Sequence, residues 1–109
     1  MIHIQEAVEI INPQQIVIDV FGKESLMYKI AQCESNFDSH AIGDSNLICK
    51  QTREPIRSRG VWQINNCAYP EITDEQAFDP VWSTQWAKKQ FEKGMIKKEW
   101  TKCYSIIQD

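Results

Sequence analysis

The sequence predicts a mainly α fold with one short irregular or β-hairpin insertion. Two proline-led helix starts, Asn12-Pro13 and Asp79-Pro80, and an amphipathic stretch over residues 24–34 indicate the helices. The insertion is indicated by residues 35–59, which are rich in Ser, Asn and Asp and contain Pro55. We therefore expect a helical domain in which an irregular segment flanks a cleft.

The beginning of the chain separates into a lead-in and the first helix. Residues 1–12 alternate weakly between apolar and polar, as in a short helix or a loose segment. An asparagine cap followed by proline predicts a helix over residues 13–21 that ends at Gly22. The length of 109 residues fits one domain, which we place at residues 16–109 after a lead-in at residues 1–15.

The second helix, over about residues 24–34, places Met27, Ile30, Ala31 and Glu34 along one side. Glu34 is therefore expected to lie near the core at the C-terminal end of this helix.

The second half contains further helix signals. The apolar run at residues 60–65 is short enough to be a strand or the start of a helix. Residues 73–76 have the form of a capping box. The Asp79-Pro80 start predicts a helix through Lys93 that stops at Gly94, and a last helix is expected over residues 97–107.

Composition places the chain among ordinary globular proteins, with 42% hydrophobic and 25% charged residues. No apolar run approaches the roughly 20 residues of a membrane span. The first residues lack the basic and apolar regions of a signal peptide. An export signal was removed, or the chain is part of a longer protein, or it leaves the cytosol by another route.

The net charge of −3 is distributed unevenly. Basic residues concentrate in two groups, which form solvated surfaces or attract an anionic polymer. Nucleic acid is not the expected polymer, because the chain is acidic overall and contains no nucleic-acid motif. The groups are Lys50, Arg53, Arg57 and Arg59, and Lys88, Lys89, Lys93, Lys97 and Lys98.

Four cysteines, Cys33, Cys49, Cys67 and Cys103, lack the CxxC spacing of zinc sites. Two disulfides in an oxidising compartment are the expected arrangement, each contributing about 2–4 kcal/mol. Three pairings are open, and buried free thiols are the alternative.

Glu34 is the residue that points to catalysis. A carboxyl at the C-terminal end of a helix meets the negative end of the helix dipole, which disfavours its charged form. Shielding by an apolar neighbour such as Trp62 would raise its pKa further, as a general acid requires near neutral pH. This pattern suits protonation of a glycosidic oxygen.

Several segments together resemble the lytic transglycosylase branch of the lysozyme-like superfamily. Residues 33–37, Cys-Glu-Ser-Asn-Phe, are similar to its ESxF segment, and residues 58–65, Ser-Arg-Gly-Val-Trp-Gln-Ile-Asn, to its SxGLMQ segment. Residues 77–80, Ala-Phe-Asp-Pro, resemble the segment that closes the cleft, and residues 100–103 a Trp-x-x-Cys ending. The order and spacing of these motifs cover about residues 16–104.

The resemblance implies a lysozyme-like α+β fold and roles for individual residues. Glu34 matches the catalytic acid, and Gln63 and Asn65 match positions that contact sugar groups. Ser58 stands where animal lysozymes have a second carboxylate, which implies a single glutamate assisted by the acetamido group of the substrate. The expected substrate-binding residues are Ser58, Trp62, Gln63, Asn65, Tyr69 and Tyr104, with Trp62 offering an aromatic face to a sugar.

The sequence also departs from this pattern. Ser83 and Gln90 replace an asparagine and an aromatic residue that are usual in the family. Three acids, Asp38, Asp44 and Glu54, lie in the irregular stretch and are alternative sources of a second carboxylate.

The resemblance implies a lytic transglycosylase that cleaves the β-1,4 bond between N-acetylmuramic acid and N-acetylglucosamine in peptidoglycan. The competing interpretations are a hydrolytic lysozyme and a non-catalytic glycan-binding module with the same fold. No metal or cofactor is implied, and the partner is the glycan strand. We expect a periplasmic or extracellular monomer or a domain of a larger protein.

Overall fold

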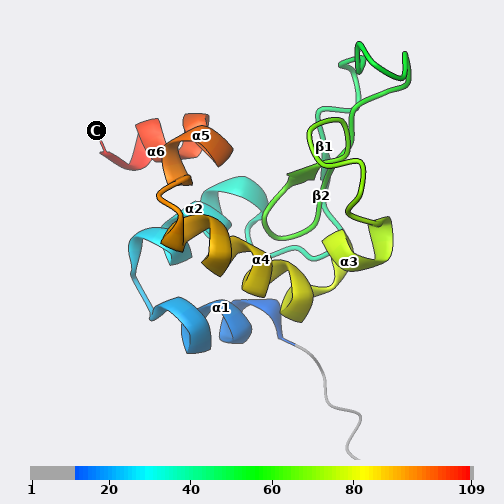
Figure 1. Cartoon of the computed structure of the whole chain (residues 1–109). Helices are drawn as coiled ribbons and strands as arrows, with labels where there is room; N and C mark the ends of the chain where they lie inside the picture. The colour runs from blue at the N-terminus through cyan, green and yellow to red at the C-terminus, as the bar shows by residue number, and fades with distance from the viewer. Residues whose placement is uncertain (1–11, 109) are drawn as a thin grey trace, which may run out of the picture.

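The computed structural model describes residues 12–108, and expectations for residues 1–11 and Asp109 lie outside this part of the chain. In the described part there are six helices and a small antiparallel sheet, which lies to one side of the helices (Figure 1). This arrangement confirms the mainly α prediction. The helices are α1 (Pro13–Phe21), α2 (Leu26–Ser35), α3 (Asp74–Phe78), α4 (Pro80–Glu92), α5 (Ile96–Glu99) and α6 (Thr101–Gln108), and the strands are β1 (Ile42–Gly43), β2 (Ser58–Arg59) and β3 (Ile64–Asn65).

Three helix starts have the caps that the sequence predicts. The Asn12 side chain accepts a hydrogen bond from the backbone N–H of Gln15 at the start of α1. The Asp79 side chain accepts from the first turn of α4, and Thr73 and Gln76 form a reciprocal capping box at α3. Helix α1 begins at Pro13, and the division into a lead-in and a domain at residues 15 and 16 stays a prediction.

Two helix boundaries differ from the prediction. Helix α2 begins two residues late, at Leu26, because the Ser25 hydroxyl caps it by accepting from Tyr28 N–H. The last helix is broken at Trp100, which has φ −126° and ψ 50°. Trp100 is 2% exposed and donates its indole N–H to the Trp62 carbonyl at 2.9 Å, so burial of this side chain accompanies the break between α5 and α6.

The sheet resolves the ambiguous run at residues 60–65 as a turn followed by a strand. Strand β2 pairs with β1 on one side and with β3 on the other, with Ser58 opposite Gly43 and Asn65. The turn between β2 and β3 needs glycine, because Gly60 has φ +77° and a Cβ there would lie 2.3 Å from the Ala77 carbonyl oxygen.

The core forms where the helices meet this turn. Trp62 is 0% exposed, packs against the rings of Phe21 and Trp100, and donates its indole N–H to the Thr84 hydroxyl. The predicted inner side of α2 is confirmed, since Met27, Ile30 and Ala31 are buried. Helix α1 packs on α2 and α4, and α6 packs on α2. Among residues 12–108, no helix is long and apolar enough to span a bilayer.

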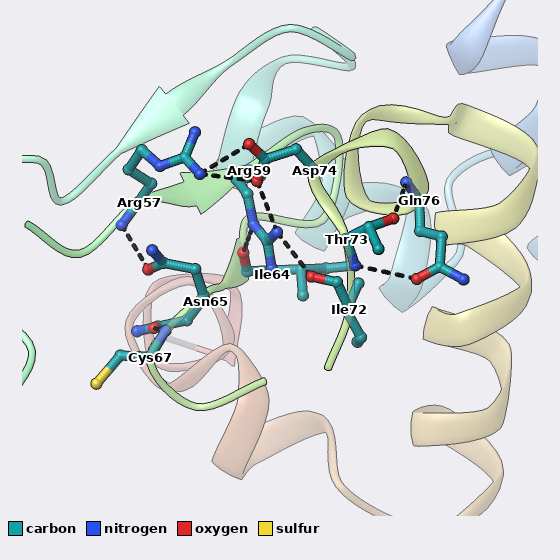
Figure 2. Close-up of polar contacts among 10 residues, drawn as sticks. Arg57, Arg59, Ile64, Asn65, Cys67, Ile72, Thr73, Asp74 and Gln76 are labelled. Atoms are coloured by element: carbon teal, nitrogen blue, oxygen red, sulfur yellow. Dashed lines mark hydrogen bonds and ion pairs between the residues drawn. The ribbon is translucent and has the colours of Figure 1, made fainter. Parts of the chain in front are cut away.

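A buried arginine anchors the sheet to α3 (Figure 2). Arg59 is 1% exposed and donates to the carbonyls of Ile64 and Ile72 and to the Asp74 carboxylate. Arg57 binds the same carboxylate at 2.8 Å. Arg57 and Arg59 thus have a structural partner, which weakens their assignment to an anionic polymer.

All four cysteines are paired, Cys33 with Cys103 and Cys49 with Cys67. The first bond joins α2 to α6, and the second closes the irregular segment that projects from the sheet (Figure 1).

Candidate active site

Glu34 lies in the last turn of α2, where the helix meets the sheet. The next residue but one, Asn36, takes the left-handed conformation that ends the helix. Ser35 donates its hydroxyl to the Val61 carbonyl at 2.8 Å, which ties this helix end to the turn between β2 and β3. The Glu34 side chain is half-buried, so it is reachable from solvent while much of its hydration is removed.

A hollow of about 480 Å³ opens beside this carboxyl. Its wall combines the end of α2, the segment after β1 and the first turns of α6. It is lined by Cys33, Glu34, Asp44, Lys102, Cys103 and Ile106.

The surroundings favour the protonated form of Glu34. Burial raises the pKa of Glu34 most, the neighbouring Asp44 carboxylate raises it further, and the Lys102 ammonium lowers it, so that it lies at about 7 rather than 4.5. A carboxyl with this pKa holds its proton at mildly acidic pH and can both release and regain it near neutrality.

Asp44 is the acid that the structure brings to Glu34. The Ser58 hydroxyl donates to Asp44 Oδ2 at 2.6 Å, so Ser58 orients a carboxylate from the position at which animal lysozymes carry one. Of the other two acids considered from the sequence, Asp38 accepts from the backbone of His40, and Glu54 lines a different hollow. Of the three acids considered as a second carboxylate, Asp44 is thus the one that the loop after β1 brings to the end of α2, and catalysis by Glu34 alone stays a prediction.

A second hollow, of about 470 Å³, brings together four of the predicted substrate-binding residues, Trp62, Gln63, Asn65 and Tyr69. Gln63, Asn65 and Tyr69 form part of its wall, and the segment from Lys98 to Trp100 forms another part. This segment contains the end of α5 and leads into α6, which lines the hollow beside Glu34. The lining residues are Trp62, Gln63, Asn65, Ala68, Tyr69, Trp86, Lys98, Glu99 and Trp100.

The two amides in this hollow are partly used by the fold. The Gln63 amide nitrogen donates to the carbonyls of Ala41 and Gly60. The side-chain oxygen of Asn65 accepts hydrogen bonds from the backbone N–H groups of Cys67 and Ala68. Of these two side chains, Asn65 keeps its amino group without a bond to any of residues 12–108, while the Gln63 oxygen lies so close to Gly43 that a Cβ there would be 2.5 Å away.

Tyr69 belongs to a polar group that the sequence did not reveal. Its hydroxyl donates to the Glu99 carboxylate and accepts from the Gln90 amide. Burial, the hydrogen bond to Glu99 and the charge of Glu99 raise the pKa of Tyr69 above its ordinary range. Both Glu99 and Lys98 were missed as residues of the hollow, because nothing in their local pattern distinguishes them from a solvated helix end.

Three predicted substrate-binding residues are engaged within the fold, and their contact with a substrate stays a prediction. Trp62 lies behind the wall of the second hollow, but it is 0% exposed and its ring packs against Phe21 and Trp100, so the ring has no open face. Ser58 is 3% exposed, and its hydroxyl is directed to Asp44 rather than to a ligand. Tyr104 is half-buried and packs against the core, outside the linings of both hollows.

The two departures from the family pattern are also buried. Ser83 is 0% exposed, and Gln90 is 6% exposed and contacts Tyr69. Both side chains therefore serve packing within α4 and its neighbours. Among the described residues, no group of three or more His, Cys, Asp or Glu side chains is placed to hold a metal ion.

Comparison with family models gives a match to the lysozyme-like domain over residues 21–102, which is most of the chain. The chain belongs to the lysozyme-like domain family. Comparison with curated proteins and with solved structures gives no match. Membership places this lysozyme-like domain among glycosidases and transglycosylases that act on peptidoglycan, and the matched range contains Glu34, Asp44 and both hollows except Cys103 and Ile106.

Proposed function

We propose that this domain cleaves the β-1,4 bond between N-acetylmuramic acid and N-acetylglucosamine in peptidoglycan, with Glu34 as the general acid. The observation that supports this proposal is a half-buried carboxyl with a pKa of about 7 in the wall of an open hollow. A second hollow, lined by the side-chain amides of Gln63 and Asn65 and by the end of α5, would hold further sugars of the strand.

The proposed reaction has two steps. Protonated Glu34 gives its proton to the glycosidic oxygen as the bond from that oxygen to the muramyl C1 breaks. The positive charge that develops at C1 is then neutralised by an oxygen nucleophile, whose proton passes to the ionised Glu34. This restores the acid for the next turnover.

The nucleophile distinguishes two candidate functions. In a lytic transglycosylase, which the motif order favours, the acetamido group assists and the muramyl 6-hydroxyl attacks to give a 1,6-anhydro product. In a hydrolytic lysozyme, water attacks. The specific observation that favours hydrolysis is Asp44, because a second carboxylate beside the acid can stabilise the cationic centre or direct water.

The site of action that we propose is the cell envelope or the extracellular space. Two disulfides in a chain of this length are stable in an oxidising compartment, where peptidoglycan is also found.

The proposal is tested with purified peptidoglycan and the pair Glu34→Gln and Glu92→Gln. Glu92 is exposed at the end of α4, so its substitution matches the loss of charge away from both hollows. We expect Glu34→Gln to lose at least about 100-fold of the cleavage rate, because proton transfer by a positioned group contributes that much or more. Glu92→Gln should cleave like the wild type.

Mass spectrometry of the products then separates the candidates. Anhydro-muramyl ends indicate a transglycosylase, and reducing ends indicate a hydrolase. Equal cleavage by Glu34→Gln and wild type would refute the role of Glu34, and binding of peptidoglycan without any product would indicate a non-catalytic module.

A further inference from the structure

Lys102 is a cation in the same hollow as the candidate acid. It lies in the first turn of α6, far from Glu34 in the sequence, and it shares the lining of the hollow with Glu34 and Asp44. The chemical steps proposed above do not use it. In the proposed reaction Glu34 must lose and regain a proton, and a cation that lines the same hollow affects both steps.

A disulfide fixes Lys102 relative to Glu34. Cys33 immediately precedes Glu34 and Cys103 immediately follows Lys102, and these two cysteines are bonded with a Cα–Cα distance of 5.9 Å. Both cysteines also line the hollow. The covalent link therefore keeps the backbones of residues 34 and 102 close together, although they belong to different helices.

The two charged groups beside Glu34 have opposite effects on its pKa. The segment after β1 presents Asp44, which favours the protonated carboxyl, and α6 presents Lys102, which favours the ionised carboxyl. The remaining lining residues, Cys33, Cys103 and Ile106, carry no charge. Burial and Asp44 act in the same direction, so Lys102 is the group that offsets them.

We propose that Lys102 is a positioning residue for the reaction, whose ammonium, held beside Glu34 by the Cys33–Cys103 disulfide, lets one carboxyl serve first as acid and then as base. The inference rests on the proposed role of Glu34. A carboxyl that kept its proton too firmly would donate poorly and would not take part as a base in the second step. The cation makes release of the proton easier without contacting the reacting atoms.

The first experiment compares Lys102→Met, Lys102→Arg and the control Lys97→Met. Lys97 is exposed on α5 and lies outside both hollows, so its substitution removes the same charge elsewhere. Titration of the Glu34 side-chain carboxyl by NMR reports the effect directly, and the pH dependence of cleavage reports it during turnover. The titration uses the intact protein and needs no substrate.

We expect Lys102→Met to raise the midpoint of the Glu34 titration by about 0.5 pH unit at low salt, since an exposed ammonium acts through a screened field. The alkaline limit of cleavage should move upward with it. Lys102→Arg should restore the wild-type midpoint, and Lys97→Met should leave it unchanged. The difference between wild type and Lys102→Met should shrink at 1 M salt, where the Debye length is about 3 Å.

The second experiment tests the contribution of the disulfide. Replacing Cys33 and Cys103 by serine should shift the Glu34 midpoint in the same direction as Lys102→Met. Replacing Cys49 and Cys67 by serine should not, because that bond closes a different segment. If the first double variant does not fold, the Lys102 series still decides the role of the cation.

An unchanged Glu34 midpoint in folded Lys102→Met overturns the inference, and so does an equal shift in Lys97→Met. If Lys102 had only a structural role, Lys102→Met would change the stability of the protein but not the midpoint of the Glu34 titration. Failure of the proposed function is a separate result, namely cleavage by Glu34→Gln at the wild-type rate.

Discussion

Glu34 combines a candidate catalytic role with a cost to stability. Its pKa lies at about 7 in the folded protein and near 4.5 in an unfolded chain. Between these pH values the folded state binds a proton that the unfolded state has released. The free energy of unfolding therefore falls as the pH rises from about 4.5 to about 7, and it stays lower above that range.

We expect Glu34→Gln to be more stable than wild type at pH 9 by about 1 kcal/mol, and equally stable at pH 4. The value is reduced from the full linkage figure because the side chain is partly exposed. Urea unfolding at both pH values measures the difference, with Glu92→Gln as the control. A variant that is less stable at pH 9 would contradict the assigned burial of Glu34.

Asp44 acts on Glu34 in the opposite sense to Lys102. Replacing Asp44 by Asn removes a negative charge that raises the pKa of Glu34, so the Glu34 titration should move downward by about 0.5 pH unit. Carboxyl NMR of the two variants measures both shifts on one scale. If the Glu34 titration midpoint shifted in the same direction in Asp44→Asn and Lys102→Met, the placement of one of these charges beside Glu34 would be contradicted.

For single residues, the sequence predicts those positions that depend on neighbouring residues in the chain. Glu34 could be proposed as a candidate because the end of an amphipathic helix precedes a recognisable loop. Asp44 was one of three acids in an irregular segment, and its meeting with Glu34 depends on how β1 pairs with β2. The burial of Trp62 could not be predicted either, since it results from contacts with Phe21 in α1, Thr84 in α4 and Trp100.

At the scale of elements, the turn between β2 and β3 has the tightest steric requirement for glycine. Gly60 has a positive φ and lies against the backbone of Ala77, which is in α3. This contact holds the turn close to α3, while Ser35 holds the other side of the same turn to α2. The hairpin position therefore depends on the absence of a side chain at residue 60.

We expect Gly60→Ala to lower the free energy of unfolding by about 2–4 kcal/mol, because it adds strain to a conformation that side chains disfavour and drives a methyl group into a backbone oxygen. Gly94→Ala is the matched control, since Gly94 has φ +73° but an added methyl group there would meet no atom within 4 Å. It should lower stability by only about 1 kcal/mol. Equal effects in chemical denaturation would contradict the close packing of the turn.

The helix ends were largely predictable, because capping side chains act within four residues. The break at Trp100 was not, since a buried indole bonded to the backbone of residue 62 is a long-range effect that no periodicity contains. The sheet register was also hidden, because each strand has two residues.

At the scale of the whole molecule, two disulfides cross-link segments of different length. Cys33 and Cys103 are 70 residues apart, and Cys49 and Cys67 are 18 apart. In the chain-entropy account, the longer closed loop restricts the unfolded chain more strongly. The expected presence of two disulfides is confirmed, but four cysteines without a family pattern leave the pairing open from sequence alone.

We expect replacement of Cys33 and Cys103 by serine to lower the free energy of unfolding by about 4 kcal/mol, and replacement of Cys49 and Cys67 by about 3 kcal/mol. Urea titrations of the two double variants under identical conditions measure the order. A larger loss from the Cys49–Cys67 variant would show that native packing around these bonds outweighs loop length.

The two bonds are nested, since Cys49 and Cys67 both lie between Cys33 and Cys103. A protease that cut the peptide chain once anywhere between residues 33 and 103 would leave both fragments tethered. Cuts after Lys50 or Arg53, in the projecting segment, would fall inside both rings at once. Nicked molecules should therefore migrate as intact protein on a non-reducing gel and separate into fragments only after a thiol is added.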